Sequence, residues 1–419
     1  MNTEAPPAAP GFGPWLIDRL AVAYFLVFFL LCYTQADRAL YVLGLLPLKP
    51  TLLFALLVGP LVLLLLLSRR TRWPLAAALG ANAGLVLPFG TLAAVTLLAA
   101  AFGRETYWGE GGIYVFWVPA AFGMFLLAFI AGLAGPVARS LRLAATLAIV
   151  LLTATIAWDL VNPTFSRIPS RAAGVAREPN TAAFLLSLSL CLALNFRRFE
   201  RRDLLVIALA FLGWVGTVSR TGALMLTITL GTYVAAMIWG GSWSRLKIKA
   251  LLPAVLALAL AGLGLVGARW LATRDSGMFS LAAAQGRLAM LTGEQRLLAG
   301  NEERRDLVAL YWREILAAPV FGHGAGYSYS LPQGPHVRYL QEWANAGLPA
   351  LAAYLGLLGL GFLTFRRRRD LSGQLLMVLI AVWSCFSHGT LEQRAIPLAL
   401  GLVAAASLPA HGPRAAEAG

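Results

Sequence analysis

Four residues, Ser219-Arg220-Thr221-Gly222, form a short polar motif between two apolar segments of this 419-residue chain. Ser219 or Thr221 is a residue type that caps helices, which would leave Arg220 at a helix N-terminus. Free backbone N–H groups, the helix dipole and a guanidinium would all favour a phosphate there. The alternative interpretation is an arginine that reports topology or snorkels to the membrane surface.

A second candidate, Arg304, lies in a predicted helix over Asn301–Ala318. On a helical wheel Arg304 falls near the middle of an apolar stripe, and Arg305 at its edge. An arginine on a buried face needs an anionic partner, either a ligand or a local acid such as Glu302 or Glu303. The apolar stripe consists of Leu307, Val308, Tyr311, Trp312 and Ile315.

A third candidate, His336, follows Pro335, which is favoured in the first turn of a helix. His336 would then lie at the start of an apolar span, where the positive end of the dipole disfavours imidazolium. A neutral histidine at a membrane surface is suited to act as a general base, and a capping or interfacial role is the alternative. Because we find no Asp-x-Asp motif and no clustered carboxylates on the outer side, we expect no metal and no other cofactor.

The elements that would position these residues are membrane helices. The chain is 59% hydrophobic and 13% charged, with a mean hydropathy of +0.73, which excludes a cytosolic enzyme, a disordered chain and a disulfide scaffold. Its apolar runs predict an all-α polytopic membrane protein with about twelve transmembrane helices. The predicted spans are 15–33, 47–68, 73–102, 113–134, 141–160, 180–196, 203–218, 221–240, 249–270, 343–365, 372–390 and 394–410.

The basic residues support this count. With the N-terminus inside, sixteen of the 34 Lys and Arg residues fall on alternate inner turns, against eight on the short outer turns. The positive-inside rule therefore predicts that both termini are cytoplasmic, and the net charge of +15 reports topology rather than a nucleic-acid partner. We expect spans 1–9 in residues 1–267, an outward loop with helices and catalytic residues in 268–345, and spans 10–12 with a short tail in 346–419.

Taken together, the motifs resemble the signature of the O-antigen ligase/polymerase superfamily. The resemblance rests on Ser219-Arg220-Thr221-Gly222, on Arg304 fifteen residues before Pro319-Val320-Phe321-Gly322-His323-Gly324, and on Pro335-His336-Val337-Arg338-Tyr339-Leu340. Glu178-Pro179-Asn180-Thr181-Ala182-Ala183 is similar to the family's Pro-Asn-x-x-Ala. Two positions depart from the family pattern, because Val337 follows the histidine and Val308 lies four residues after Arg304.

The resemblance implies a metal-independent, inverting glycosyltransferase of the bacterial inner membrane with a GT-C-like fold and a periplasmic active site. As an O-antigen ligase it would transfer a glycan from undecaprenyl diphosphate to lipid A–core. Arg220 and Arg304 would hold the diphosphate and His336 would take the acceptor proton. Arg305, Arg338 and Asn180 are further candidate ligands of the diphosphate.

Three alternatives remain open. An O-antigen polymerase would use the same donor with a second lipid-linked glycan as acceptor, and a protein O-oligosaccharyltransferase would glycosylate a Ser or Thr side chain. A transporter or flippase is a different class, but transporters keep ionisable groups near the midplane or in internal repeats. The spans here carry almost no internal charge and the sequence has no repeat.

Overall fold

Helices make up all the regular secondary structure of the described residues in this computed structural model. These residues are 12–67, 73–109, 113–168, 171–239, 297–387 and 389–409. The prediction of an all-α polytopic membrane protein is confirmed, because six described helices are long and apolar enough to cross a membrane. Twelve spans and the GT-C likeness stay predictions, and the expected span 249–270 lies outside the described residues.

The helix bounds agree broadly with the predicted spans. The six long apolar helices are α1 (Phe12–Tyr33), α5 (Ala83–Phe102), α6 (Ile113–Leu133), α7 (Gly135–Val161), α10 (Arg220–Trp239) and α14 (Arg338–Arg367). Shorter helices are α2 (Ala36–Val42), α3 (Pro50–Leu67), α4 (Leu75–Ala81), α8 (Pro179–Ala193), α9 (Arg201–Thr217), α13 (Leu297–Ala317), α15 (Leu371–Ser384) and α16 (Ala395–Ala406), with 3-10 turns η2 (Gly174–Ala176) and η3 (Tyr327–Tyr329).

Several boundaries differ from the prediction. The span 73–102 is two helices, α4 and α5, separated at Asn82. Span 10 begins earlier, at Arg338, and its helix is interrupted at Ala346 and Gly347. Gly347 has φ +73°, and a Cβ there would lie 2.1 Å from the carbonyl oxygen of Val320, so this close approach requires glycine.

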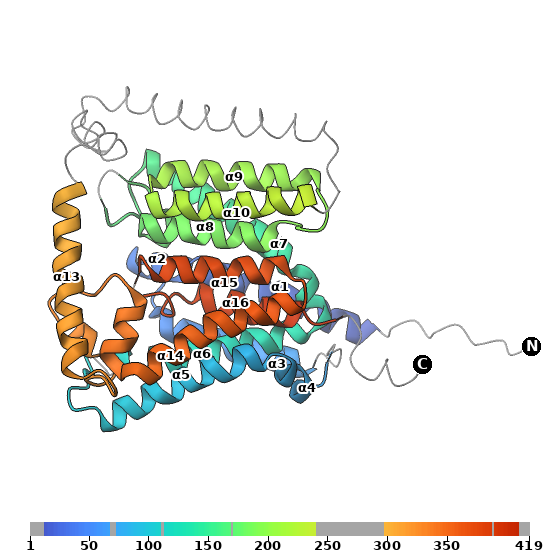
Figure 1. Ribbon diagram of the computed structural model, residues 1–419. Coiled ribbons are helices and arrows are strands. Elements are labelled where there is room, and N and C mark those ends of the chain that lie inside the picture. The colour runs from blue at the N-terminus through green and yellow to red at the C-terminus, as the bar shows by residue number, and fades with distance from the viewer. Residues whose placement is uncertain are drawn as a thin grey trace, which may run out of the picture.

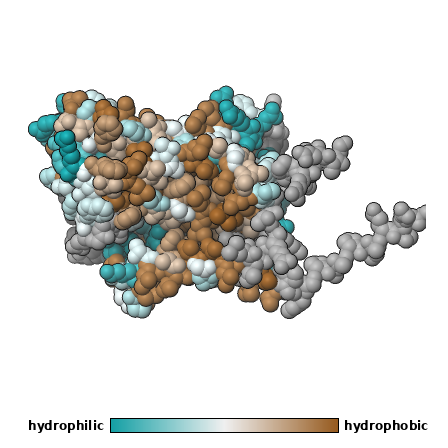
Figure 2. All heavy atoms as spheres, turned by 90° about the horizontal axis from the view of Figure 1, so that it is seen from below, coloured by the Kyte–Doolittle hydropathy of each residue, from teal (hydrophilic) through white to brown (hydrophobic). Residues whose placement is uncertain are grey.

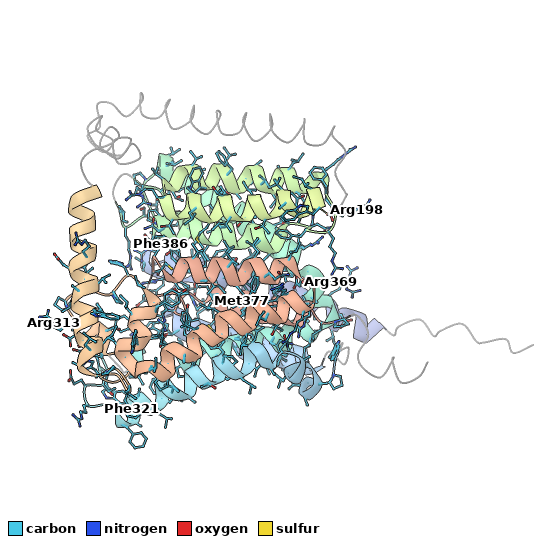
Figure 3. All side chains as sticks on the ribbon, in the orientation of Figure 1. Arg198, Arg313, Phe321, Arg369, Met377 and Phe386 are labelled. Atoms are coloured by element: carbon cyan, nitrogen blue, oxygen red, sulfur yellow. The ribbon has the colours of Figure 1, made fainter. Side chains whose placement is uncertain are left out.

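The long helices run side by side, and α13 lies across one end of the bundle (Figure 1). We call this the outer end. Arg198 and Arg369 lie at the opposite, inner end, whereas Phe386 and Arg313 lie at the outer end (Figure 3). Three basic turns that the sequence assigns to one side, near residues 139–142, 197–202 and 366–369, line a single cavity at the inner end.

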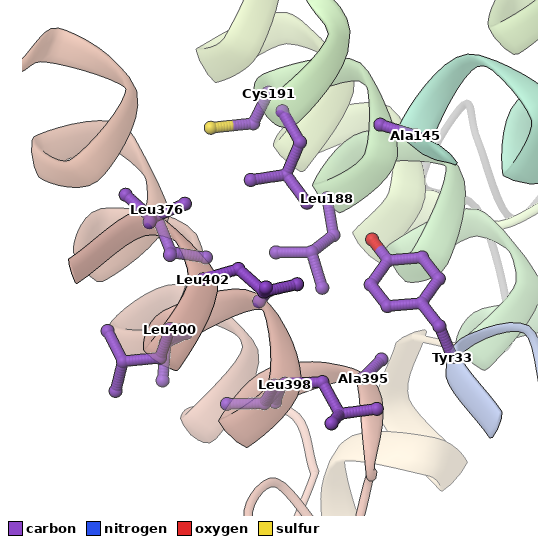
Figure 4. Packing of buried hydrophobic residues seen from close by; sticks show 14 of the residues in the cluster. Tyr33, Ala145, Leu188, Cys191, Leu376, Ala395, Leu398, Leu400 and Leu402 are labelled. Carbon is purple, nitrogen blue, oxygen red and sulfur yellow. The ribbon is translucent and has the colours of Figure 1, made fainter. Parts of the chain in front are cut away.

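One apolar core connects most of the helices. In Figure 4, side chains of α1, α8, α15 and α16 meet there, among them Tyr33, Leu188, Leu376 and Leu402. Large apolar side chains also cover much of the outside, as Figure 2 shows for one face, and this surface suits contact with lipid. Small residues let helices approach closely, since a Cβ at Gly401 of α16 would lie 2.3 Å from the Phe125 carbonyl oxygen of α6.

Candidate functional site at the outer end

The motif at 219–222 begins α10, as predicted. The Ser219 hydroxyl accepts a hydrogen bond from the backbone N–H of Gly222 at 3.0 Å, which makes Ser219 the capping residue. Arg220 is therefore the first residue of the helix, and its side chain is exposed. A Cβ at Gly222 would meet the Cβ of Ala183 at 2.4 Å, so this glycine lets the start of α10 lie against α8.

Asn180, in the first turn of α8, joins this motif to a neighbouring loop. Its side-chain oxygen accepts hydrogen bonds from the Ser219 hydroxyl at 2.9 Å and from a guanidinium nitrogen of Arg171 at 3.0 Å. Arg171 also donates to the Thr217 carbonyl oxygen at 3.0 Å. Two motifs about forty residues apart in the sequence thus form one hydrogen-bonded unit, with the exposed Arg220 beside it.

The loop between α7 and α8 is shaped by one buried carboxylate. Asp159 accepts hydrogen bonds from backbone N–H groups on both limbs of the loop, including Thr164 and Phe165 at 2.8 Å and Ala173 at 2.9 Å. The backbone N–H of Arg167 donates to the carbonyl oxygen of Arg177 at 3.0 Å. These bonds bring two arginines of the loop next to each other.

Arg38 of α2 completes a group of three outer arginines with Arg167 and Arg177. Burial and the positive charges of Arg167 and Arg394 lower the pKa of Arg38, and burial together with Arg167 and Arg38 lowers the pKa of Arg177. Nη1 of Arg177 is buried without a hydrogen-bond partner. Within the described residues, no carboxylate forms an ion pair with any of the three.

His336 lies two residues before α14, because the residue that precedes the helix is Val337. Pro335 is therefore not in the first turn, and the expectation that it would be is wrong. The physical reason is the backbone of His336, whose φ of +51° is left-handed and incompatible with continuing a helix. The His336 side chain is exposed, directly before the helix start.

Arg338, another candidate phosphate ligand, is buried in a network of its own. It pairs with Glu342 one turn later and with Glu392 at 3.3 Å, and it donates to Gln341 at 3.0 Å. Burial raises the pKa of Glu392, although the charge of Arg338 acts in the opposite direction. The Tyr329 hydroxyl also donates to Glu392. An arginine already neutralised by two carboxylates is placed to fix the start of α14 rather than to bind a diphosphate.

The crossing helix α13 has the predicted amphipathic character with a narrower stripe. Leu307, Tyr311 and Ile315 are buried, whereas Val308 and Trp312 are 44% and 47% exposed. Residue 304 lies seven positions before Tyr311 and so shares its helical face, but its side chain is outside the described residues. Arg305 is exposed.

The connection between α15 and α16 links the two halves of the outer end. Glu392 contacts Arg338 beside His336, and two residues later Arg394 makes a bidentate pair with Asp37 at 2.6 and 2.7 Å. Asp37 directly precedes Arg38 of the three outer arginines. The structure thus connects the residues around His336 to the arginines near Asn180 and Arg220.

Residues 204–355 match a family model described as O-antigen ligase. This part of the chain is similar to the O-antigen ligase superfamily. The members of that superfamily are glycan ligases and polymerases, and the match supports an enzyme of this general type. The matched residues 204–355 include Arg220, Arg304 and His336, whereas Asn180 lies before them in the sequence. No curated protein matches the chain.

Several residues of the outer end are not indicated by any motif in the sequence. The sequence marks Arg38, Arg167 and Arg177 only as charges on outer turns, and it does not predict the ion pairs of Arg338 and Arg394. One signal was present, because arginines on outer turns run against the positive-inside rule and so require another explanation. No signal in the sequence pairs Asp37 with Arg394, which are 357 residues apart.

Proposed function

We propose that this protein is an O-antigen ligase of the bacterial inner membrane. It transfers a glycan from undecaprenyl diphosphate to a sugar hydroxyl of lipid A–core on the periplasmic side. The observation that carries the proposal is the exposed Arg220 at a serine-capped helix start, tied through Ser219 to Asn180. The family match adds the class of reaction.

In this proposal the diphosphate is bound by positive charge and by helix geometry. Arg220 and the first N–H groups of α10 face the phosphate oxygens, and Arg304 on α13 is the second ligand. Arg305 is the alternative on the same helix. The three outer arginines, which have no described carboxylate partner, add a positive field that attracts an anionic donor to this end.

The chemical step is a single displacement. The oxygen of the acceptor hydroxyl attacks the anomeric carbon, the bond from that carbon to the diphosphate oxygen breaks, and the lipid diphosphate leaves with the electron pair. His336 takes the proton of the hydroxyl. Arginines stabilise the charge that develops on the leaving group, and one displacement inverts the anomeric configuration. Arg338 and its two carboxylates hold the helix start next to His336.

The test is an acceptor comparison with purified protein and lipid-linked glycan. One reaction contains lipid A–core, a second contains only more lipid-linked glycan, and a third contains a Ser/Thr peptide. Extension of lipid A–core alone supports the ligase. Extension of the lipid-linked glycan would identify a polymerase, and peptide glycosylation a protein oligosaccharyltransferase.

A matched pair of variants locates the reaction. Arg220→Ala should abolish most transfer, whereas Arg198→Ala, an exposed arginine at the inner end, should leave it unchanged. Equal activity of the two variants would move the active site away from the outer end.

A further inference from the structure

A second basic site lies at the inner end, where a cavity of about 460 Å³ opens between the ends of α7, α8, α14, α15 and α16. Five arginines line it together with one carboxylate, Asp370. Figure 3 places Arg369 at the end opposite to Phe386 and Arg313, so the cavity is separate from the candidate site at the outer end. The five arginines are Arg139, Arg142, Arg197, Arg368 and Arg369.

The carboxylates nearby are already engaged. Glu200 pairs with Arg142 at 3.3 Å and with Arg202 at 2.9 Å. Asp370 accepts the backbone N–H groups of Ser372 and Gly373 and so caps α15. Asp370 also interacts electrostatically with Arg197 and Arg368, but one lining carboxylate against five lining arginines leaves the cavity with a net positive charge.

Three lining arginines, Arg139, Arg197 and Arg369, are exposed and form no ion pair with a carboxylate in the described part of the chain. Arg368 donates only to neutral groups, the carbonyl oxygens of Ala81 and Ala404 and the hydroxyl of Ser407. Its role is to join helix ends. The other guanidinium groups are in position for an anion with several oxygen acceptors.

The cavity is also apolar on part of its wall. Leu141, Leu192, Phe196, Leu371 and Val403 line it beside the arginines. An amphiphile with an anionic head matches both kinds of lining, whereas a free phosphate would use only the arginines. Basic pockets between the ends of membrane helices are a common form of binding site for anionic lipid headgroups.

We propose that this cavity binds the phosphate headgroup of an anionic phospholipid from the leaflet at the inner end, with acyl chains against its apolar wall. Arg139, Arg197 and Arg369 bind the phosphate oxygens. The site does not depend on the proposed transferase activity. Its effect is to anchor the five helix ends that surround the cavity.

The experiment measures lipid binding to the delipidated full chain by native mass spectrometry. Phosphatidylglycerol is compared with phosphatidylcholine, for the wild type and for the double variant Arg139→Gln/Arg369→Gln. We expect selective binding of phosphatidylglycerol by the wild type and a loss of about 25-fold in the double variant, since each basic residue near an anionic surface contributes roughly fivefold. Arg366→Gln/Arg367→Gln removes two exposed charges from the same end outside the cavity lining, and it should bind as the wild type does.

Three outcomes would overturn the proposal. Equal binding of the two lipids means that charge is not recognised, and an equal loss in both double variants means that only the general charge of this end matters. Complete displacement of phosphatidylglycerol by millimolar inorganic phosphate would assign the cavity to a soluble phosphate compound. If the double variant does not fold, Arg197→Gln alone is compared with the wild type, and unchanged selectivity contradicts the proposal.

Discussion

The start of α10 gives a prediction that separates a catalytic arginine from a structural one. The side chain of Arg220 is exposed and forms no hydrogen bond with another described residue. Arg220→Ala should therefore change the free energy of unfolding by less than about 0.5 kcal/mol. The same variant should lower the rate of glycan transfer about 10²–10³-fold, the usual effect of removing one donor to a developing negative charge.

Its neighbour Ser219 should behave in the opposite way. Ser219→Ala removes the helix cap, which contributes about 1 kcal/mol, and the hydrogen bond to Asn180, which contributes about another 1 kcal/mol. We expect a loss of stability of about 2 kcal/mol, with a smaller loss of activity than Arg220→Ala because the guanidinium remains. Arg220→Lys keeps the charge but lacks the planar fork, and it should remain impaired.

Thermal unfolding in detergent and initial transfer rates are measured for the three variants under the same conditions. The reasoning fails if Arg220→Ala has full activity, or if its activity falls only together with its unfolding temperature. Full activity of Arg220→Lys would show that a point charge is sufficient there.

Four further outcomes are expected. His336→Gln should lower transfer about 10²–10⁴-fold, and near wild-type turnover would exclude the general base. Arg304→Ala should reduce the rate more than Arg305→Ala, and the reverse order would make Arg305 the phosphate ligand. A chelator should leave the rate within about twofold, and a large loss restored by magnesium would refute the arginine-based scheme. Arg338→Leu should destabilise the protein by about 3–5 kcal/mol, as measured by unfolding, because it leaves buried carboxylates unpaired. Since burial holds the pKa of Glu392 above that of the unfolded chain, the stability of this variant should fall as pH rises above the ordinary pKa of a glutamate.

Features that depend on neighbouring residues in the sequence could be predicted. The cap at Ser219, the helix over 301–318 and its end before Pro319 follow from local propensity, and α13 confirms them with an earlier start. The mistake at Pro335 is also local in origin. Proline suits a first helical turn, but the left-handed backbone of His336 prevents the helix from beginning there.

Contacts that depend on tertiary packing could not be predicted. The pairs Arg338–Glu392 and Asp37–Arg394 join residues 54 and 357 positions apart, and each requires the start of α14 or α2 to lie against the α15–α16 connection. The break at Gly347 has the same cause, because it depends on the close approach of the turn at Val320. In both cases the decisive partner is distant in the chain, so no periodicity or motif contains it.

The two ends of the molecule use arginine differently, and this difference supports the proposed site. In the topology that we propose, basic residues at the inner end agree with the positive-inside rule, whereas those at the outer end oppose it. Arg338 and Arg394 at the outer end are neutralised by buried carboxylates and stabilise the fold. Four arginines at the outer end form no ion pair with a described carboxylate. They are Arg38, Arg167, Arg177 and Arg220, and some of them lie next to Asn180 and the start of α10. Because no described carboxylate forms an ion pair with them, their charge is consistent with the anionic donor that we propose for this end.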